Sequence, residues 1–194
     1  MTILLVRHGE TVWNLQRRFQ GRFDSPLTAR GVAQARALGR FLATLPEAVA
    51  APIVASPQGR ARRTAEIIRD ELGGAALSID ERLREHSLGE WDGLTYPEMA
   101  AQFPDVFDRE DRHEWYFRAP DAESYAVFAA RIGHWLAEQD ENAAVIAVAH
   151  GLVSRVLRGL YAGLPRTEAL MLPVRQDRIF RLSAGIIETL VALP

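Results

Sequence analysis

The chain contains no cysteine and no lysine, and all 23 of its Lys-or-Arg cations are arginine. Without cysteine it can form no disulfide, has no thiolate nucleophile and cannot bind zinc or an iron–sulfur cluster through sulfur. The lack of cysteine fits a reducing compartment, and we expect a cytoplasmic protein. Without lysine, any phosphate group must be bound by arginine, histidine, a neutral donor or the backbone.

Long apolar runs and an excess of one charge are missing as well. The longest apolar run near the N-terminus, residues 3–6, is too short for a signal-peptide core or a membrane-spanning helix. The chain has 23 arginines and 25 acidic residues, so its formal net charge is −2. It has no block of positive charge that could follow a nucleic-acid backbone. We therefore expect neither a membrane nor a nucleic acid as a partner.

Length and composition are those of an ordinary globular domain. The chain has 194 residues, of which 48% are hydrophobic and 25% charged, and it shows no linker, repeat or low-complexity stretch. We therefore expect a single domain over residues 1–194. Short apolar runs alternate with longer stretches of helical periodicity, which predicts an α/β fold. Its three layers would be a mostly parallel central sheet and helices on both faces.

The expected strands are the β-rich segments 2–6, 53–55, 77–79, 143–149, 178–183 and 186–191. The last two, joined by Ala184-Gly185, should form an antiparallel hairpin at a sheet edge. Helical periodicity predicts helices over 28–45, 57–72, 123–139 and 152–161. We expect Thr28 to cap the first helix, Pro46 to end it, and Ser56-Pro57 to form the capped start of the second.

The stretch 94–121 is the least regular part of the chain, with short helices expected near 97–103 and 104–109. Its polar and aromatic side chains include Arg109, Arg112, His113, Trp115, Tyr116 and Arg118. We interpret the stretch as an insertion, or cap, folded over the edge of the sheet. Its arginines and rings could recognise a second anionic group or a flat ring, or the rings could simply pack the insertion onto the sheet.

Polar residues follow three of the expected strands. Strand 2–6 is followed by Arg7-His8-Gly9-Glu10, strand 53–55 by Ser56-Pro57-Gln58-Gly59-Arg60, and strand 143–149 by His150-Gly151. Because the carboxyl ends of parallel strands meet at the same edge of a sheet, these tips should converge on one crevice, the usual ligand site of such sheets. Each tip leads into a turn or a helix start, whose free N–H groups favour an anion. The sequence therefore predicts a compact anionic ligand, and phosphate is the natural candidate.

Taken singly, each of these features has a plainer interpretation. A lone histidine after a strand is more often a hydrogen-bonded structural residue than a catalyst. Arg60, Arg62 and Arg63 would usually form a solvated charged face of a helix. The expected convergence of the strand tips is what favours a functional site.

Longer strings carry a family resemblance. The string Leu4-Leu5-Val6-Arg7-His8-Gly9-Glu10-Thr11-Val12-Trp13-Asn14 resembles the signature opening of the histidine phosphatase superfamily, also called the phosphoglycerate mutase-like fold. Further matches follow in the family's order: 20–28, Gly31 with Gln34-Ala35, Ser56-Pro57, Arg60-Ala61 with Thr64-Ala65, Leu83, Glu85, Gly89, Trp91, Gly93, Glu123-Ser124 and 148–151. Two departures, Ala122 and Leu152 where the family often has glycine, replace no group that does chemistry. The resemblance is much more specific for the superfamily than for a substrate.

The resemblance implies that His8 is the nucleophile, whose neutral imidazole attacks phosphorus and forms a phosphohistidine that water then hydrolyses. Flanking arginines would help to keep the ring neutral. A hydrogen bond from one ring nitrogen, with a backbone carbonyl as the expected acceptor, would aim the other nitrogen at phosphorus. Arg7, Arg60 and His150 match the positions that stabilise the charge on the transferring phosphoryl group.

Glu85 matches the family's acid–base position. It would give a proton to the leaving alcohol and then activate the water, provided that burial and the nearby phosphate help it to hold that proton. Its plainer interpretation is an exposed carboxylate paired with Arg82 or Arg84.

Weaker candidates for binding phosphate or substrate are Asn14, Gln20, Gly21 and Gly151. The polar loop at 20–21 could equally be a plain connector. With arginine and histidine as donors, we expect no metal ion and no other cofactor. His86, His113 and His134 have no metal-ligand spacing around them, and we interpret all three as surface or structural residues.

The family contains phosphatases and phosphoglycerate mutases, which share this chemistry. Because the chain is short and Leu94-Thr95-Tyr96-Pro97 resembles the phosphatase branch, we expect a metal-independent phosphomonoester hydrolase for a small phosphorylated metabolite. The alternatives are a cofactor-dependent phosphoglycerate mutase and a non-catalytic phosphate-binding module. The resemblance also places the insertion 94–121 over the active site. A homodimer could form through the edge hairpin, and the sequence does not decide the oligomeric state.

Overall fold

A six-stranded sheet with the order β3-β2-β4-β1-β5-β6 forms the centre of the structure, a computed structural model that describes residues 1–106 and 114–191. The strands are β1 (Thr2–Arg7), β2 (Ile53–Ala55), β3 (Leu77–Ile79), β4 (Ala144–Ala149), β5 (Arg178–Ser183) and β6 (Ile186–Val191). The first four are parallel, whereas β5 runs antiparallel to β1 and β6 antiparallel to β5. The predicted, mostly parallel sheet with an antiparallel edge hairpin is therefore confirmed.

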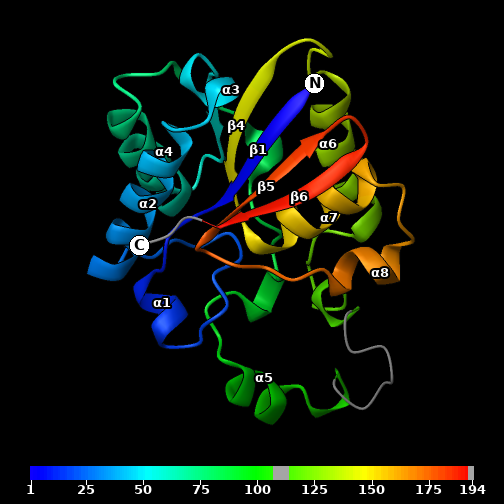
Figure 1. Cartoon of the computed structure of the whole chain (residues 1–194). Helices are drawn as coiled ribbons and strands as arrows, with labels where there is room; N and C mark the ends of the chain where they lie inside the picture. The colour runs from blue at the N-terminus through cyan, green and yellow to red at the C-terminus, as the bar shows by residue number, and fades with distance from the viewer. Residues whose placement is uncertain (107–113, 192–194) are drawn as a thin grey trace.

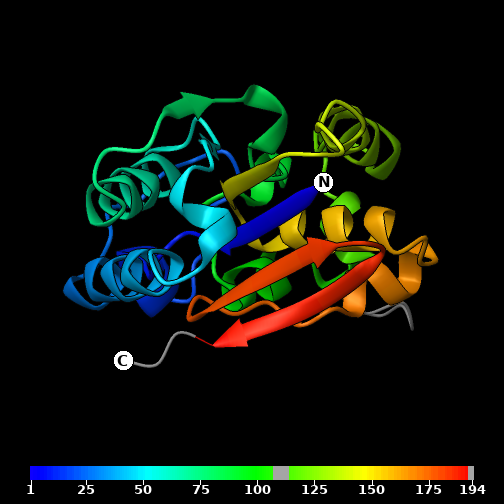
Figure 2. The same ribbon diagram turned by 45° about the horizontal axis from the view of Figure 1, so that its top comes forward.

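Helices cover both faces of this sheet (Figure 1, Figure 2). One face carries α2 (Ala29–Leu42), α3 (Pro46–Val49) and α4 (Gly59–Glu71), and the other carries α6 (Tyr125–Ala137), α7 (Gly151–Tyr161) and α8 (Arg166–Met171). Two short helices, α1 (Val12–Leu15) and α5 (Tyr96–Gln102), lie beyond the end of the sheet to which β1 points. The 3₁₀ turns are η1 (Glu81–Leu83), η2 (Gly89–Trp91), η3 (Pro104–Val106) and η4 (Trp115–Phe117). No helix in the described ranges has both the length and the apolarity to span a membrane.

Side chains of the central strands alternate between two apolar cores. In β1, Ile3 and Leu5 belong to the core that includes residues of α6, α7 and α8, whereas Leu4 and Val6 belong to the core that includes residues of α2 and α4. All four are buried. A strand that is covered on both faces needs apolar residues at every position, which explains why this segment shows no polar alternation.

Helix boundaries differ from expectation at two points. α2 ends at Leu42, and Pro46 opens α3 instead of ending the preceding helix, because proline at a first helical position gives up an N–H group that has no partner there anyway. α4 begins at Gly59, with Gln58 at the N-cap, and not at Ser56-Pro57. The hydroxyl of Ser56 contacts His150 instead. The predicted capping role of Ser56 is therefore wrong.

Apolar side chains of the described parts of the stretch 94–121, which are 94–106 and 114–121, belong to a small third cluster. The buried members of this cluster are Leu88, Trp91, Met99 and Ala119. The ring of Trp115 packs against Phe19, with 5.0 Å between ring centroids, and stacks on Tyr116 at 4.1 Å. Arg109, Arg112 and His113 lie outside the described residues, as does the last part of the helix expected at 104–109. For Trp115, packing was one of the alternatives left open by the sequence.

Candidate active site

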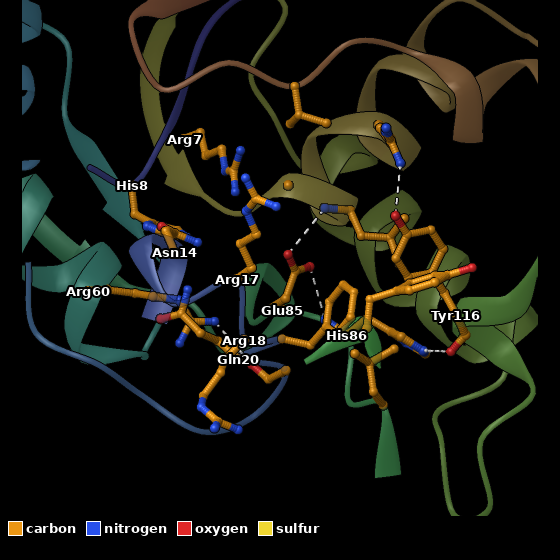
Figure 3. Close-up of a pocket in the computed structure, with 18 residues that line it drawn as sticks. Arg7, His8, Asn14, Arg17, Arg18, Gln20, Arg60, Glu85, His86 and Tyr116 are labelled. Atoms are coloured by element: carbon orange, nitrogen blue, oxygen red, sulfur yellow. Dashed lines mark hydrogen bonds between the residues drawn. The ribbon is translucent and has the colours of Figure 1, made fainter. Parts of the chain in front are cut away.

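A cavity of about 390 Å³ lies where the carboxyl ends of β1 and β4 meet, a volume typical of sites for small ligands. Figure 3 shows its lining. Arg7 and His8 come from the end of β1, Arg60 from α4, Glu85 from the segment after η1, and Gly151 from the start of α7. The structure thus brings together the strand tips that the sequence analysis expected to converge.

The ring of His8 is held by the backbone of its own neighbour. Nδ1 lies 2.8 Å from the carbonyl oxygen of Gly9, and because a carbonyl oxygen only accepts, Nδ1 carries the proton. Burial, followed by the charges of Arg60 and Arg7, holds the pKa of His8 well below its ordinary value of 6.5. At neutral pH the ring is therefore a neutral imidazole whose Nε2 has a free lone pair.

Two glycines allow the loop after β1 to sit directly on the start of α2. A Cβ on Gly9 would collide with the backbone carbonyl of Gly31, and a Cβ on Gly31 would collide with that of Glu10. In addition, the N–H of Gly9 donates to Oγ1 of Thr64 at 3.0 Å. This close backbone contact fixes the carbonyl that in turn orients the ring of His8.

His150 lies next to His8, with 5.2 Å between the ring centroids. It is completely buried, and its Nε2 lies 2.6 Å from Oγ of Ser56. Burial, followed by repulsion from Arg60, His8 and Arg7, lowers the pKa of His150 well below 6.5. Two neutral imidazoles therefore lie side by side among the guanidinium groups.

Three buried nitrogens at this place have no hydrogen-bond partner in the described parts of the chain: Nε of Arg7, Nε of Arg60 and Nδ1 of His150. Buried polar groups in proteins are normally paired. For Arg60 the remaining nitrogens are engaged, since Nη1 donates to Asp24 at 3.1 Å and Nη2 to the carbonyl of Gly21 at 3.0 Å. A cluster of unpaired nitrogens beside a neutral imidazole can accommodate an oxyanion.

Asn14 faces the cavity with its amide group already oriented. Its Oδ1 accepts hydrogen bonds from the N–H of Thr11 at 3.1 Å and from Nε2 of Gln176 at 3.0 Å. The NH₂ group is thereby left as the free donor, which is the group that an anion would need. Gln176, which precedes β5, also donates to the carbonyl of His8 at 3.2 Å. Gln176 was not among the site residues predicted from the sequence, and no local signal marks it.

The carboxylate of Glu85 lies at the N-terminus of α7. Oε2 accepts from the N–H of Leu152 at 3.2 Å, and Oε1 accepts from the N–H of Val153 at 3.3 Å. Its alternative partners are engaged elsewhere: Arg82 pairs with Asp80 and Glu138, and Arg84 with Glu123. The structure therefore places Glu85 in the cavity and not in a surface ion pair.

A buried ion pair anchors the segment behind Glu85. Arg131 donates to both carboxylate oxygens of Glu123, at 2.8 and 2.9 Å, and also reaches the carbonyl of Arg82. Burial raises the pKa of Glu123, but the hydrogen bonds and charge of Arg131, with nearby His86 and Arg84, outweigh it and lower that pKa to about 2. This ion pair, with the bond to Arg82, connects α6 to the segment that carries Glu85.

Gln58 connects two parts of the site, although the sequence analysis did not select it. Its Nε2 donates to the carbonyl of Gly21 at 2.7 Å, and its Oε1 accepts from the N–H of Glu85 at 2.7 Å. A polar residue close to the end of a strand could have suggested a role in the site. Its two partners, Gly21 and Glu85, are remote from it in the sequence.

Gln20, Gly21 and Gly151 all line the cavity. Gly21 has a φ of 45°, and a Cβ there would overlap the carboxylate of Asp92. Glycine is thus required at this position by both conformation and space. A Cβ on Gly151 would lie 3.8 Å from the guanidinium carbon of Arg7, so this backbone runs directly beside that cation.

The remaining histidines differ in position. His86 is buried, lines the cavity and donates from Nε2 to the carbonyl of Tyr116 at 2.8 Å. His134 is exposed, and His113 lies outside the described residues. Within residues 1–106 and 114–191, no group of three or more His, Cys, Asp or Glu side chains is arranged to hold a metal ion.

Comparison with known proteins agrees with the fold and the motifs. A family profile, "Histidine phosphatase superfamily (branch 1)", matches residues 3–184. "Probable phosphoglycerate mutase GpmB" of Enterobacter sp. (strain 638) is 36% identical over 190 residues, which cover 94% of this chain and 84% of that protein. Among solved structures, YhfR of Bacillus stearothermophilus is 34% identical, with a TM-score of 0.80 over 98% of this chain and 95% of that one. A mycobacterial glucosyl-3-phosphoglycerate phosphatase in complex with VO3 is 28% identical, with a TM-score of 0.79 over 99% and 97% of the two chains. The chain therefore belongs to the histidine phosphatase superfamily, branch 1.

Proposed function

We propose that this protein hydrolyses phosphomonoesters of small metabolites through a phosphohistidine on His8, without a metal ion. The observation that carries the proposal is the state of His8. Its Nδ1 is held by the Gly9 carbonyl, burial and two arginines keep the ring neutral, and Nε2 is left with its lone pair. A nucleophile has these properties.

In the first step, the lone pair on Nε2 of His8 forms a bond to phosphorus. The bond between phosphorus and the ester oxygen breaks, and Glu85 gives its proton to the departing oxygen. In the second step, Glu85 takes a proton from water, whose oxygen bonds to phosphorus as the N–P bond breaks. Inorganic phosphate leaves, and His8 and Glu85 return to their starting states.

The charge on the transferring phosphoryl group is met by donors that are already in place. Arg7, Arg60, His150 and the NH₂ group of Asn14 supply them, and the first three each have a buried nitrogen without a partner among the described residues. Donors that are held before the reaction need no reorganisation during it. Several fixed donors of this kind can do the electrostatic work that a metal ion does elsewhere.

We propose hydrolysis and not transfer of the phosphoryl group back to a substrate. The relatives named probable phosphoglycerate mutase favour the transfer. The similarity to a mycobacterial glucosyl-3-phosphoglycerate phosphatase favours hydrolysis. The segment at 94–97, which resembles the phosphatase branch, favours it too. We further propose that residues 1–194 act as a single domain with 94–121 as its cap, because Tyr96 and Tyr116 line the cavity. A non-catalytic binding module would have no use for the arrangement of His8 and Glu85.

Turnover of p-nitrophenyl phosphate in the presence of EDTA tests the proposal. We expect hydrolysis with EDTA present, its loss in His8→Ala, and its retention in the control His134→Ala, which changes an exposed histidine. Brief reaction with radiolabelled substrate should label wild-type protein at an acid-labile site and leave His8→Ala unlabelled.

The mutase alternative needs its own assay. With 3-phosphoglycerate and a bisphosphoglycerate primer, we expect release of phosphate to exceed interconversion of the phosphoglycerates. Fast interconversion of the phosphoglycerates with slow release of phosphate would show that the protein is a mutase and not a hydrolase. A folded protein that turned over no phosphomonoester would favour the binding module.

A further inference from the structure

The cavity carries more positive charge than one phosphoryl group requires. Its charged lining among the described residues consists of Arg7, Arg17, Arg18, Arg60, Arg155 and Glu85. Arg18 is neutralised by Glu98, at 2.8 Å. Arg7 and Arg60 are assigned to the phosphoryl group in the proposed reaction. Two guanidinium groups, on Arg17 and Arg155, are then left without an assigned role.

Arg17 is placed in the cavity at a cost in backbone conformation. Its φ is 55°, in the left-handed region that favours glycine or asparagine. The turn that ends α1 accounts for this φ, since chains often leave a helix through one left-handed residue. The turn does not account for a long cationic side chain at that residue. Strained positions of this kind gather at functional sites.

The guanidinium group of Arg17 has no partner in the described parts of the chain. No hydrogen bond or ion pair joins it to another described side chain or carbonyl, and the residue is exposed. In Figure 3 the side chain extends into the cavity, toward Arg7. A guanidinium that is unpaired and aimed into a cationic cavity can bind an anion with little rearrangement.

Arg155 is the second unassigned cation, and two hydrogen bonds orient its side chain. It lies four residues after Gly151 in α7, so both face the cavity. Its Nε donates to the carbonyl of Leu172 at 2.8 Å and its Nη1 to the hydroxyl of Tyr116 at 3.3 Å. Neither partner is charged, and no carboxylate within the described ranges pairs with it. Its charge acts on the site: burial lowers the pKa of Arg7, Glu85 raises it, and Arg155 lowers it further.

We propose that Arg17 and Arg155 form a second anion-binding subsite in this cavity, next to the phosphoryl site. The preferred substrates would then carry a second anionic group, a carboxylate or another phosphate, on the part that leaves as the alcohol. This inference rests on the proposed function, which places the transferred phosphoryl group at His8. It differs from recognition by arginines of the cap, because Arg17 follows α1 and Arg155 lies in α7.

Binding of phosphonates, which cannot be hydrolysed, tests the subsite by calorimetry. The probes are propylphosphonate, its analogue with a terminal carboxylate, and its analogue with a terminal second phosphonate. We expect wild-type protein to bind at least one doubly charged probe about tenfold more tightly than propylphosphonate, as one charge-assisted hydrogen bond provides. The two doubly charged probes show whether the subsite takes a carboxylate, a phosphate or both.

The variants are Arg17→Gly, Arg155→Gln and the control Arg36→Ala. Glycine suits the φ of residue 17, and glutamine keeps a donor for the Leu172 carbonyl while removing the charge. We expect each of the first two to bring the ratio of dissociation constants between singly and doubly charged probes toward one. Arg36 is exposed on α2 and does not line the cavity, so Arg36→Ala should keep the wild-type ratio.

Two results would overturn the subsite. One is equal affinity of wild-type protein for all the probes. The other is a wild-type ratio that persists in both Arg17→Gly and Arg155→Gln. Thermal melting of each variant checks that it folds. Arg17→Gly should melt no lower than wild type, because glycine adopts the left-handed backbone conformation of residue 17 without strain. Because the probes are not turned over, failure of phosphomonoester hydrolysis would refute the proposed function and leave this ratio measurable.

Discussion

Oγ of Ser56 lies 2.6 Å from Nε2 of His150, and both side chains are buried. The hydroxyl occupies one ring nitrogen and leaves Nδ1 as the nitrogen that can face a bound anion. When Ser56 donates the hydrogen of this bond, Nδ1 carries the ring proton and can donate to a phosphoryl oxygen. Ser56 thus orients a ring that it does not neighbour in sequence.

Ser56→Ala should therefore weaken catalysis without removing any group that touches phosphorus. We expect kcat/KM for p-nitrophenyl phosphate to fall about tenfold, the effect of one buried hydrogen bond of roughly 1.4 kcal/mol. Ser78→Ala, which changes an exposed serine in β3, is the matched control. A well-folded Ser56→Ala protein with wild-type kcat/KM would contradict this role.

Glu85→Gln should reveal an acid by its dependence on the leaving group. Propanol is a poor leaving group and needs a proton, whereas nitrophenolate departs without one. Because Glu85 also activates water in the second step, which both esters share, the comparison uses kcat/KM, which reports formation of the phosphohistidine. We expect kcat/KM for propyl phosphate to fall by about 10²–10⁴, and kcat/KM for p-nitrophenyl phosphate to fall much less. Steady-state kinetics with both esters measure the difference. The exposed Glu90 supplies the control Glu90→Gln. Equal losses on both esters would show that Glu85 does not protonate the leaving group.

Stability should fall with pH in a window set by the two buried imidazoles. Burial and nearby arginines hold the pKa values of His8 and His150 below 6.5 in the folded state. The unfolded chain then binds more protons than the folded chain below about pH 6.5, so the free energy of unfolding decreases as pH falls. Each histidine contributes a slope of up to about 1.4 kcal/mol per pH unit. Glu123, with a pKa of about 2 when folded, starts to weaken the fold only at lower pH.

Urea unfolding between pH 7.5 and pH 5.5 measures this slope. His150→Asn removes one of the two titrating groups, so we expect its slope to be smaller than that of wild type. His134→Ala, at an exposed position, should keep the wild-type slope. Identical slopes in His150→Asn and wild type would mean that His150 does not resist protonation in the folded protein.

The sequence alone was sufficient for the strands, for a mostly parallel sheet and for its edge hairpin, because the information is local. Apolar runs without polar alternation marked β1 and β4, and the strand bounds 53–55, 77–79, 178–183 and 186–191 agree with β2, β3, β5 and β6. Parallel strands then require their tips to converge, which predicts that Arg7, His8, Arg60 and His150 meet at one edge of the sheet. The motif strings identified the family for the same reason, since each is a run of neighbouring residues.

Helix starts were less predictable from local signals. Ser56-Pro57 is a good capped start, yet α4 begins at Gly59, and the Ser56 hydroxyl contacts His150, 94 residues away. Pro46 opens a short helix instead of ending a long one. In both cases a tertiary contact or a turn decides between conformations that the local sequence allows equally.

What the sequence determined by itself is therefore the fold class, the family and the convergence of the strand tips. Only the tertiary structure decided which carbonyl holds His8, and that Gln58 and Gln176 support Glu85 and Asn14. It also decided that, among the described residues, no carboxylate pairs with Arg17 or Arg155 in the cavity. The physical reason is distance along the chain. Periodicity and propensity act over a few residues, whereas these contacts join segments up to 168 residues apart, and their partners are chosen by the packing of the whole chain.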